Sequence, residues 1–242
     1  MEKNILLISS SSVAGSAYLD PFEQTIKDFL KGINEIVFVP YSADKNNWDN
    51  YTKKVRERFT LFGIDVKGIH EVDNIDNFKA IFVGGGNSFR LLTHLQQFDL
   101  LSKINNAVLN KGMRYIGSSA GSNVACKTIC TTNDMPIVYP IKGFDAINLI
   151  PLQINPHYID PDPNSTHMGE TRGDRIKEFH EANDTPVIGL REGAFLKVSD
   201  EYFTSQKMLL GGTNGANFFF KGKEPVNIPG EREITITSNG IS

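Results

Sequence analysis

The sequence predicts an α/β fold in which a mostly parallel, doubly wound sheet lies between two layers of helices. Two observations in the first half of the chain lead to this prediction. Short apolar runs alternate with longer amphipathic runs, and the short runs are almost continuously hydrophobic, as parallel strands covered on both faces must be. We expect these strands at residues 4–9, 36–40, 63–69, 80–84 and 114–118.

The longer runs between these strands carry apolar residues at helical spacing. One helix is expected over residues 20–30 and a second over residues 46–62. Residues 91–109 are expected to form two helices, with a break near Phe98 and Asp99. The alternation of strand and helix implies right-handed crossovers that place helices on both faces of the sheet, which makes a three-layer sandwich.

The regular alternation stops in the second half of the chain. An apolar run at 148–154 is expected to form a strand, and residues 155–165 contain too many turn formers to be regular structure. A charged helix at 169–182 and a strand at 186–190 follow. Short antiparallel strands are expected at 194–198, 202–204, 217–221 and 233–237. The sequence shows no repeat and no linker, so we expect residues 1–242 to form a single domain.

The composition narrows the class of protein. Of 242 residues, 40% are apolar and 22% are charged, and the net charge is −3, which provides no basic surface for nucleic acid. The first apolar stretch is too short for a signal peptide or a membrane span, so we expect a cytoplasmic protein without a membrane partner. Cys126 and Cys130 lie on a predicted helix and are interpreted as free thiols of a reducing compartment.

The segment Gly117-Ser118-Ser119-Ala120-Gly121 matches the pattern G-x-S-x-G at the end of a predicted strand. In this motif a sharp strand-to-helix turn presents the central serine, and its neighbours must be small. Ser119 is therefore the candidate nucleophile, and the amide of Ala120 is a candidate oxyanion donor. The alternative is a Gly/Ser-rich turn that only connects a strand to a helix.

A serine nucleophile needs a base, which is most often a histidine. His157 is the favoured candidate because it directly follows an apolar strand, and His167 is the second choice. His157, Asp160, Asp162 and His167 are also metal-ligand types, but their spacing is not that of a typical zinc site. We therefore expect no metal.

Three consecutive glycines form another candidate site, in Gly84-Gly85-Gly86-Asn87 after a predicted strand. Glycines allow a close backbone approach and can leave an amide free to face an anion. Gly85 and Gly86 are therefore candidates for the second oxyanion donor, with an ordinary tight turn as the alternative. The spacing is not that of a dinucleotide-binding loop, and we expect no cofactor.

Six motifs occur together and in the order of a known family. They are Val83-Gly84-Gly85-Gly86-Asn87, Gly117-Ser118-Ser119-Ala120-Gly121-Ser122-Asn123, Thr131-Thr132-Asn133-Asp134-Met135-Pro136-Ile137, Asn155-Pro156-His157, Gly169-Glu170-Thr171-Arg172 and Ile188-Gly189-Leu190-Arg191-Glu192-Gly193. On these motifs, which span most of its length, the chain resembles the peptidase E family. These α-aspartyl dipeptidases are serine peptidases with the class I glutamine amidotransferase-like fold.

The resemblance implies that Ser119 is the nucleophile and His157 its base. The acidic partner of the histidine is then Glu192 or Asp134. We favour Glu192, because the related amidotransferases use Cys, His and Glu in that chain order. In that case Asp134 binds the substrate amine or braces its own loop.

The resemblance also implies a small-molecule substrate, a dipeptide with an N-terminal aspartate. Arg172 is the expected carboxylate clamp, since a guanidinium binds a carboxylate with two parallel hydrogen bonds, and the alternative is a surface residue of a helix. Asn87 is the second expected substrate-binding residue. Two departures from the family pattern are Ser118, where a bulky aromatic residue is expected, and Arg90, where a neutral residue is expected.

The predicted function is thus cleavage of Asp-X dipeptides through an acyl-enzyme, by a monomer or homodimer. Two alternatives share the fold. One is a cyanophycinase-like or isoaspartyl hydrolase, and the other is a binding protein that has lost the chemistry.

Overall fold

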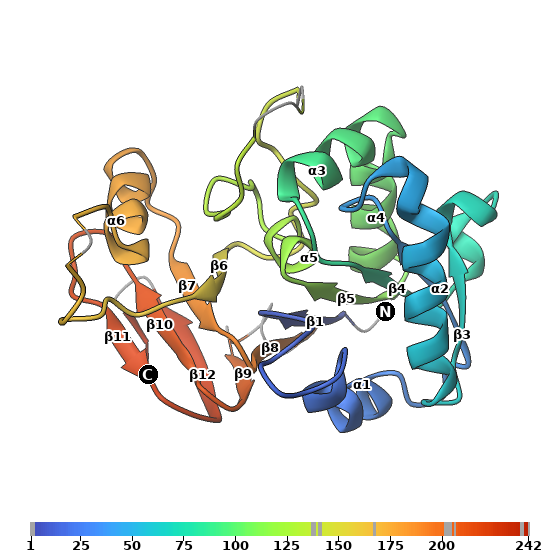
Figure 1. Cartoon of the computed structure of the whole chain (residues 1–242), viewed down its shortest axis with the longest axis horizontal. Helices are drawn as coiled ribbons and strands as arrows, with labels where there is room; N and C mark the ends of the chain where they lie inside the picture. Colours follow the sequence, from blue (N-terminus) through green and yellow to red (C-terminus); the bar gives the residue numbers. More distant parts are fainter. Residues whose placement is uncertain are drawn as a thin grey trace.

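A computed structural model of the chain describes residues 3–136, 139, 142–166, 168–200, 205, 207–237 and 240–241. In these residues the main feature is a sheet with the strand order β13-β12-β9-β8-β1-β5-β4-β2-β3. A second, smaller sheet has the order β11-β10-β7-β6 and lies beside the end of the large one (Figure 1).

The parallel half of the large sheet confirms the predicted α/β fold. Neighbouring strands in the order β1-β5-β4-β2-β3 all pair in parallel, and each lies within two residues of its predicted range. The five strands are β1 (Asn4–Ile8), β2 (Glu35–Val39), β3 (Asp65–Gly68), β4 (Ala80–Val83) and β5 (Arg114–Ser118).

The antiparallel half continues the large sheet from β1. Its strands are β8 (Ala194–Ser199), β9 (Lys207–Gly212), β12 (Arg232–Thr237) and β13 (Gly240–Ile241). The small sheet contains β6 (Gln153–Tyr158), β7 (Val187–Arg191), β10 (Ala216–Phe219) and β11 (Val226–Ile228). The strand predicted at 202–204 lies outside the described residues.

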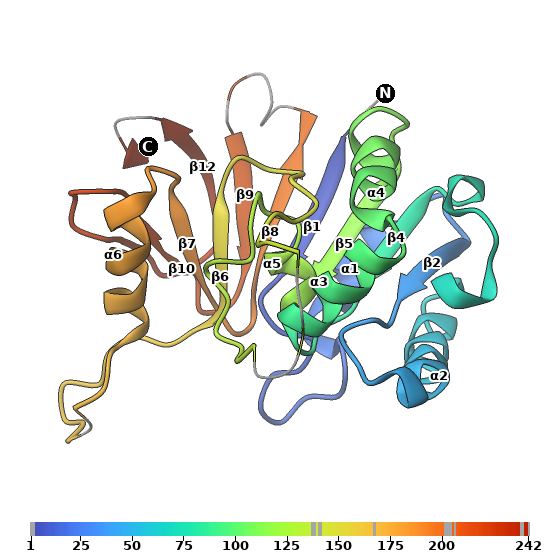
Figure 2. The same cartoon turned by 90° about the horizontal axis from the view of Figure 1, so that it is seen from above.

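Helices cover both faces of the large sheet, as the crossover argument predicts (Figures 1 and 2). The helices near the large sheet are α1 (Glu23–Phe29), α2 (Trp48–Thr60), α3 (Ser88–Gln97), α4 (Leu100–Leu109) and α5 (Ala120–Asn123). Another helix, α6 (Arg172–Ala182), lies on the small sheet. Short 3₁₀ turns lie at Asp20–Phe22, Lys45–Asn47, Ile69–Glu71 and Ile75–Asn77.

The alternation of side chains along β1 shows how the layers form. Leu6 packs in the core that contains the apolar residues of α1 and α2, whereas Ile5 and Leu7 pack in the core that contains those of α3 and α4. All three side chains are fully buried. A strand that is apolar on both faces therefore fits only the middle layer of a sandwich. Helix α6 covers the small sheet from outside, with Ile176 against Tyr158 and Phe219.

Two expectations for the second half of the chain were wrong. The strand predicted at 148–154 begins only at Gln153 and continues to Tyr158, so that His157 lies inside a strand and not after one. Pro156 is tolerated there because β6 is the edge strand of the small sheet. The helix after Ser119 ends at Asn123, so neither Cys126 nor Cys130 is helical; Cys126 is buried, Cys130 is exposed, and both are free.

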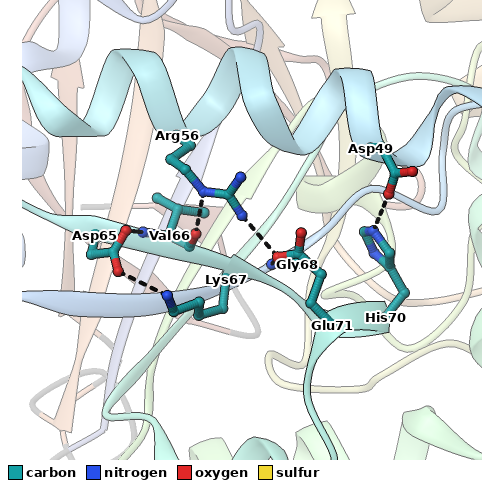
Figure 3. Close-up of polar contacts among 8 residues, drawn as sticks. All are labelled: Asp49, Arg56, Asp65, Val66, Lys67, Gly68, His70 and Glu71. Carbon is teal, nitrogen blue, oxygen red and sulfur yellow. Dashed lines mark hydrogen bonds and ion pairs between the residues drawn. The ribbon is translucent and has the colours of Figure 1, made fainter.

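The edge strand β3 is held to α2 by polar contacts (Figure 3). Arg56 donates from Nε to the carbonyl oxygen of Val66 at 2.8 Å and from Nη2 to Oε2 of Glu71, also at 2.8 Å. The same carboxylate oxygen accepts the amide of Gly68 at 2.7 Å. Arg56 thus satisfies the carbonyl of Val66 and holds the Glu71 carboxylate that satisfies the amide of Gly68, two groups that an edge strand would otherwise leave unpaired.

We expect Arg56→Ala to lower the free energy of unfolding by about 1–2 kcal/mol, because it removes two hydrogen bonds at a partly exposed site. Urea denaturation should show a lower midpoint at an unchanged m-value. The matched control is Lys67→Ala, which removes only an exposed ion pair to Asp65 and should change stability by less than about 0.5 kcal/mol. Equal effects of the two substitutions would contradict this account of the edge.

No helix in the described part of the chain combines the length and apolar character needed to cross a membrane.

Candidate active site

Ser119 lies on a sharp turn between β5 and α5, at the carboxyl edge of the parallel strands. Its backbone angles are φ 54° and ψ −111°, a strained conformation for a residue with a side chain. The turn requires both flanking glycines. A Cβ on Gly117 would lie 2.5 Å from the carbonyl oxygen of Gly121, and one on Gly121 would lie 2.0 Å from that of Val83. This is the geometry by which a nucleophile elbow presents a serine.

His157 connects Ser119 to an acid. Its Nε2 lies 2.8 Å from Oγ of Ser119, and its Nδ1 lies 2.7 Å from Oε1 of Glu192. An imidazole that donates from Nδ1 to the carboxylate is left with a free lone pair on Nε2, which accepts the serine hydroxyl hydrogen. The hydroxyl, the imidazole and the carboxylate are therefore arranged in series, as general-base activation of a serine requires.

Glu192 follows β7 directly and lies on the turn that leads from the small sheet to β8. Its carbonyl oxygen accepts a hydrogen bond from Nδ2 of Asn214 at 2.7 Å. Gly193, with φ 84°, lets the chain reverse at this point. The strand end and this contact together hold the carboxylate toward His157.

Asp134 lies elsewhere. Its Oδ2 accepts the amide of Ser88, the first residue of α3, at 2.7 Å and the hydroxyl of Thr132 at 3.3 Å. The structure therefore brings Glu192, and not Asp134, to His157. A carboxylate at the N-terminus of a helix pairs with free amides and with the positive end of the helix dipole, so Asp134 braces its loop against α3.

The Gly-rich turn packs against the serine. A Cβ on Gly85 would lie 3.0 Å from Cβ of Ser119. The carbonyl oxygen of Gly85 accepts hydrogen bonds from Ser42 and Tyr51. Because the C=O and N–H of a trans peptide point in opposite directions, the amide of Gly86 faces away from those two side chains. This arrangement suits an oxyanion donor, together with the amide of Ala120 at the start of α5.

Arg172 is the first residue of α6 and is half-buried. Desolvation lowers the pKa of its guanidinium, as does the neighbouring charge of Arg175, whereas Asp134 raises it. Arg172 and Arg175 line an open cavity of about 590 Å³ together with Asn133, Met135 and Ile159. Asp160, Asp162 and Glu170 line it too, so the cavity combines charges of both signs with apolar surface.

Both polar atoms of the Asn87 side chain form hydrogen bonds within the protein. Its Oδ1 accepts the amide of Arg90 as the cap of α3, and its Nδ2 donates to the carbonyl oxygen of Met135 at 3.1 Å. Arg90 donates from Nε to the hydroxyl of Tyr139 at 2.6 Å. The structure therefore places the Asn87 side chain between α3 and the loop of Met135.

Ser118, which like Arg90 departs from the family pattern, is fully buried, and its Oγ has no hydrogen-bond partner among the described residues.

Asp160, one of the metal-ligand types noted in the sequence, is paired with an arginine. Arg191 binds both carboxylate oxygens of Asp160, at 2.6 and 2.8 Å, and this pairing is the main cause that lowers the pKa of Asp160. His167 lies outside the described residues. Within the described part of the chain, no group of three or more His, Cys, Asp or Glu residues could hold a metal ion.

Sequence reasoning did not select two residues that contact the peptide before His157, namely Ser9 and Asn133. Ser9 carries no signal, because one serine after a first strand looks like any turn residue. Asn133 lies next to Asp134 in a motif already noted, and that proximity was the available signal.

The family model described as "Peptidase family S51" matches residues 5–206 of the sequence. The chain belongs to peptidase family S51. The chain is 44% identical over 240 residues to a protein named peptidase E from Streptomyces coelicolor, which covers 98% of this chain and 93% of the relative. It is 43% identical over 222 residues to a Drosophila melanogaster protein named "Probable alpha-aspartyl dipeptidase", with 89% and 90% of the two chains covered.

A solved structure of a peptidase from an acI-B1 actinobacterium has the same fold as this S51 member. The TM-score is 0.69 at 15% sequence identity, and the match covers 96% of each chain. The expectation of a peptidase family, made from six short motifs, is confirmed.

Proposed function

We propose that this S51 peptidase hydrolyses dipeptides with an N-terminal aspartate through an acyl-enzyme on Ser119. The observation that carries the proposal is the series Ser119–His157–Glu192, with contacts of 2.8 and 2.7 Å. The names of the relatives from S. coelicolor and D. melanogaster support the same activity.

The reaction begins when His157 takes the proton of Ser119 as the hydroxyl attacks the peptide carbonyl. Glu192 stabilises the imidazolium that forms, and the amides of Ala120 and Gly86 stabilise the oxyanion. His157 then gives its proton to the leaving amine, which departs as the second residue of the dipeptide. A water molecule, activated by the same imidazole, attacks the acyl-enzyme and releases aspartate.

Arg172 supplies the selectivity for aspartate in this proposal. A half-buried guanidinium in the cavity pairs with the side-chain carboxylate of the substrate through two hydrogen bonds. A neutral side chain of the same shape leaves that charge without a partner, which is how a polar site rejects an isostere.

We expect Arg172→Ala to reduce kcat/KM for α-Asp-Leu by about 100-fold, mostly through a higher KM, because it removes a charge-assisted contact. Asn-Leu turnover should change by less than about threefold. Arg175→Ala is the matched control, since Arg175 lines the same cavity but is exposed and lies 3.7 Å from Glu170. Equal losses for both dipeptides, or equal effects of the two arginines, would remove the clamp role of Arg172.

The function itself is tested by release of free aspartate from a panel of α-Asp-Leu, β-Asp-Leu, Asn-Leu and Ala-Leu. The proposal predicts efficient cleavage of α-Asp-Leu alone. Preference for β-Asp-Leu would instead identify an isoaspartyl hydrolase, and binding of these dipeptides without cleavage would identify a protein that has lost the chemistry.

Action in the cytoplasm, and a monomeric or homodimeric state, belong to the same proposal and rest on the sequence alone.

A further inference from the structure

The backbone of His157 is unusual for its place in a strand. Its φ is 52°, in the left-handed region, and the pairing of β6 with β7 shifts register between Pro156 and Tyr158. A residue other than glycine occupies this region at a free-energy cost, so the surroundings must hold it there. The direction of the imidazole depends on this conformation, because an ordinary extended backbone at His157 would point its side chain elsewhere.

The peptide that joins Pro156 to His157 is bound at both ends by side chains. Its N–H donates to Oγ of Ser9 at 2.9 Å, and its C=O accepts from Nδ2 of Asn133 at 2.6 Å. In a regular parallel strand such groups bond to the neighbouring strand. Here the two bonds come from segments that are distant in the sequence.

Ser9 follows β1 and is fully buried. Its hydroxyl hydrogen is committed to the carbonyl oxygen of Leu190 at 2.7 Å. A hydroxyl has one hydrogen, so Oγ has only its lone pairs to offer His157 and must accept the amide hydrogen. Leu190 lies in β7, two residues before Glu192. One buried oxygen therefore connects the central strand of the large sheet to the strands that carry both His157 and Glu192.

The amide of Asn133 is also fixed in direction. Its Oδ1 accepts from Nδ2 of Asn155 at 2.7 Å, and Asn155 is buried and donates in addition to the carbonyl oxygen of Thr131. Because Oδ1 is engaged as an acceptor, the NH₂ group of Asn133 faces Pro156 as a donor. The loop that contains Asp134 thus supports the strand that contains His157.

We propose that Ser9 and Asn133 form a peptide clamp. It fixes the orientation of the Pro156–His157 peptide, keeps His157 in its left-handed backbone conformation and so positions the imidazole. Ser9 is fully buried, and Asn133 also lines the cavity of Arg172. Both clamp residues bind the backbone before His157 and not the reacting atoms, so they act on the reaction through His157. The peptide clamp keeps Nε2 in reach of Ser119 while Nδ1 stays in reach of Glu192. This inference rests on the proposed role of His157 as the base.

The kinetic test compares Ser9→Ala with Ser10→Ala in the full-length protein. Ser10 is equally buried, but its hydroxyl donates to Ser12 within its own loop. We expect Ser9→Ala to lower kcat for α-Asp-Leu by about 10- to 100-fold with KM changed by less than about threefold, since a small misplacement of a catalytic group has effects of this size. Ser10→Ala should stay within about threefold of the parent in both constants.

Asn133→Ala tests the other end of the clamp, with Asn105→Ala as its control. Asn105 also donates from Nδ2 to backbone carbonyls, those of Ile147 and Asn148, away from His157. Because both clamp residues act on one peptide, the double variant Ser9→Ala/Asn133→Ala should lose less than the product of the two single losses. Multiplicative losses would show two independent effects and would contradict the clamp.

A spectroscopic readout separates positioning from general loss of structure. In folded parent protein the Nδ1 proton of His157, bound to a carboxylate, should give a far-downfield ¹H resonance that Glu192→Gln removes. The clamp predicts that Ser9→Ala and Asn133→Ala shift or broaden this signal while amide spectra elsewhere stay unchanged. An unchanged resonance in both variants would overturn the clamp, whatever the substrate proves to be. Failure of the parent to cleave α-Asp-Leu would instead overturn the proposed function alone.

Discussion

Replacing Ser119 with alanine should lower α-Asp-Leu hydrolysis by at least about 10⁴-fold, because loss of the nucleophile leaves only substrate binding and the oxyanion donors. The fold should persist. Alanine keeps the same Cβ, and the turn depends on Gly117 and Gly121, not on the hydroxyl. The measurement is steady-state release of aspartate, with thermal unfolding to show that the variant is folded.

Ser118→Ala is the matched control for this experiment. It removes a hydroxyl from the adjacent residue, where Oγ is buried and has no hydrogen-bond partner in the described part of the chain. We expect its activity to remain within about threefold of the parent, as for a substitution that breaks no contact. Turnover by Ser119→Ala at the parental rate would remove Ser119 from the mechanism.

Replacing Glu192 with glutamine should reduce kcat by about 10³- to 10⁴-fold. Glutamine has nearly the same shape, but it carries no charge to stabilise the imidazolium, and its NH₂ group favours the wrong tautomer of His157. The loss should appear in kcat and kcat/KM to similar extents, because the carboxylate acts in the transition state.

Asp134→Asn is the comparison that separates the two candidate acids. Asparagine can still cap α3 through its Oδ1, so the contact to Ser88 is retained. We therefore expect less than about a tenfold loss of kcat. A larger loss for Asp134→Asn than for Glu192→Gln would contradict the assignment of Glu192 as the partner of His157.

The parallel half of the fold follows directly from the sequence. Strands β1, β2, β4 and β5 are apolar on both faces, the edge strand β3 carries Asp65 and Lys67 on one face, and the longer helices each have an apolar side. The spacing of apolar residues is therefore enough to identify the layers. The break between α3 and α4 was also predicted, and Asp99 at that break has φ 52°. Expectations of this kind depend on residues close together in the chain.

In the small sheet, β7 and β10 lie within two residues of strands predicted at 186–190 and 217–221, but β6 could not be predicted in the same way. Its strand β6 contains Asn155-Pro156-His157, and proline and asparagine are common in turns, so local propensity indicates an irregular segment. Pairing with β7 and an edge position override that preference. Tertiary context, which no local pattern reports, decided the conformation.

The residues of the candidate site also differ in whether local sequence or only tertiary contacts identify them. Ser119 can be predicted from the sequence because the elbow needs small residues at fixed spacing. His157 and Glu192 can be predicted because their motifs resemble those of a known family. The choice between Glu192 and Asp134, and the parts played by Ser9 and Asn133, depend on contacts between segments 23 to 148 residues apart. A single domain over residues 1–242 stays a prediction.

The most direct test of the central claim is to identify the acylated residue. An α-aspartyl ester with an activated leaving group should acylate the enzyme quickly, so that hydrolysis of the acyl-enzyme becomes the slow step and the intermediate accumulates. Acid quenching followed by proteolysis and mass spectrometry should find one aspartyl group on the oxygen of Ser119. An aspartyl group on Ser118 or Ser122 instead, or turnover of the ester without any acylated serine, would contradict the account.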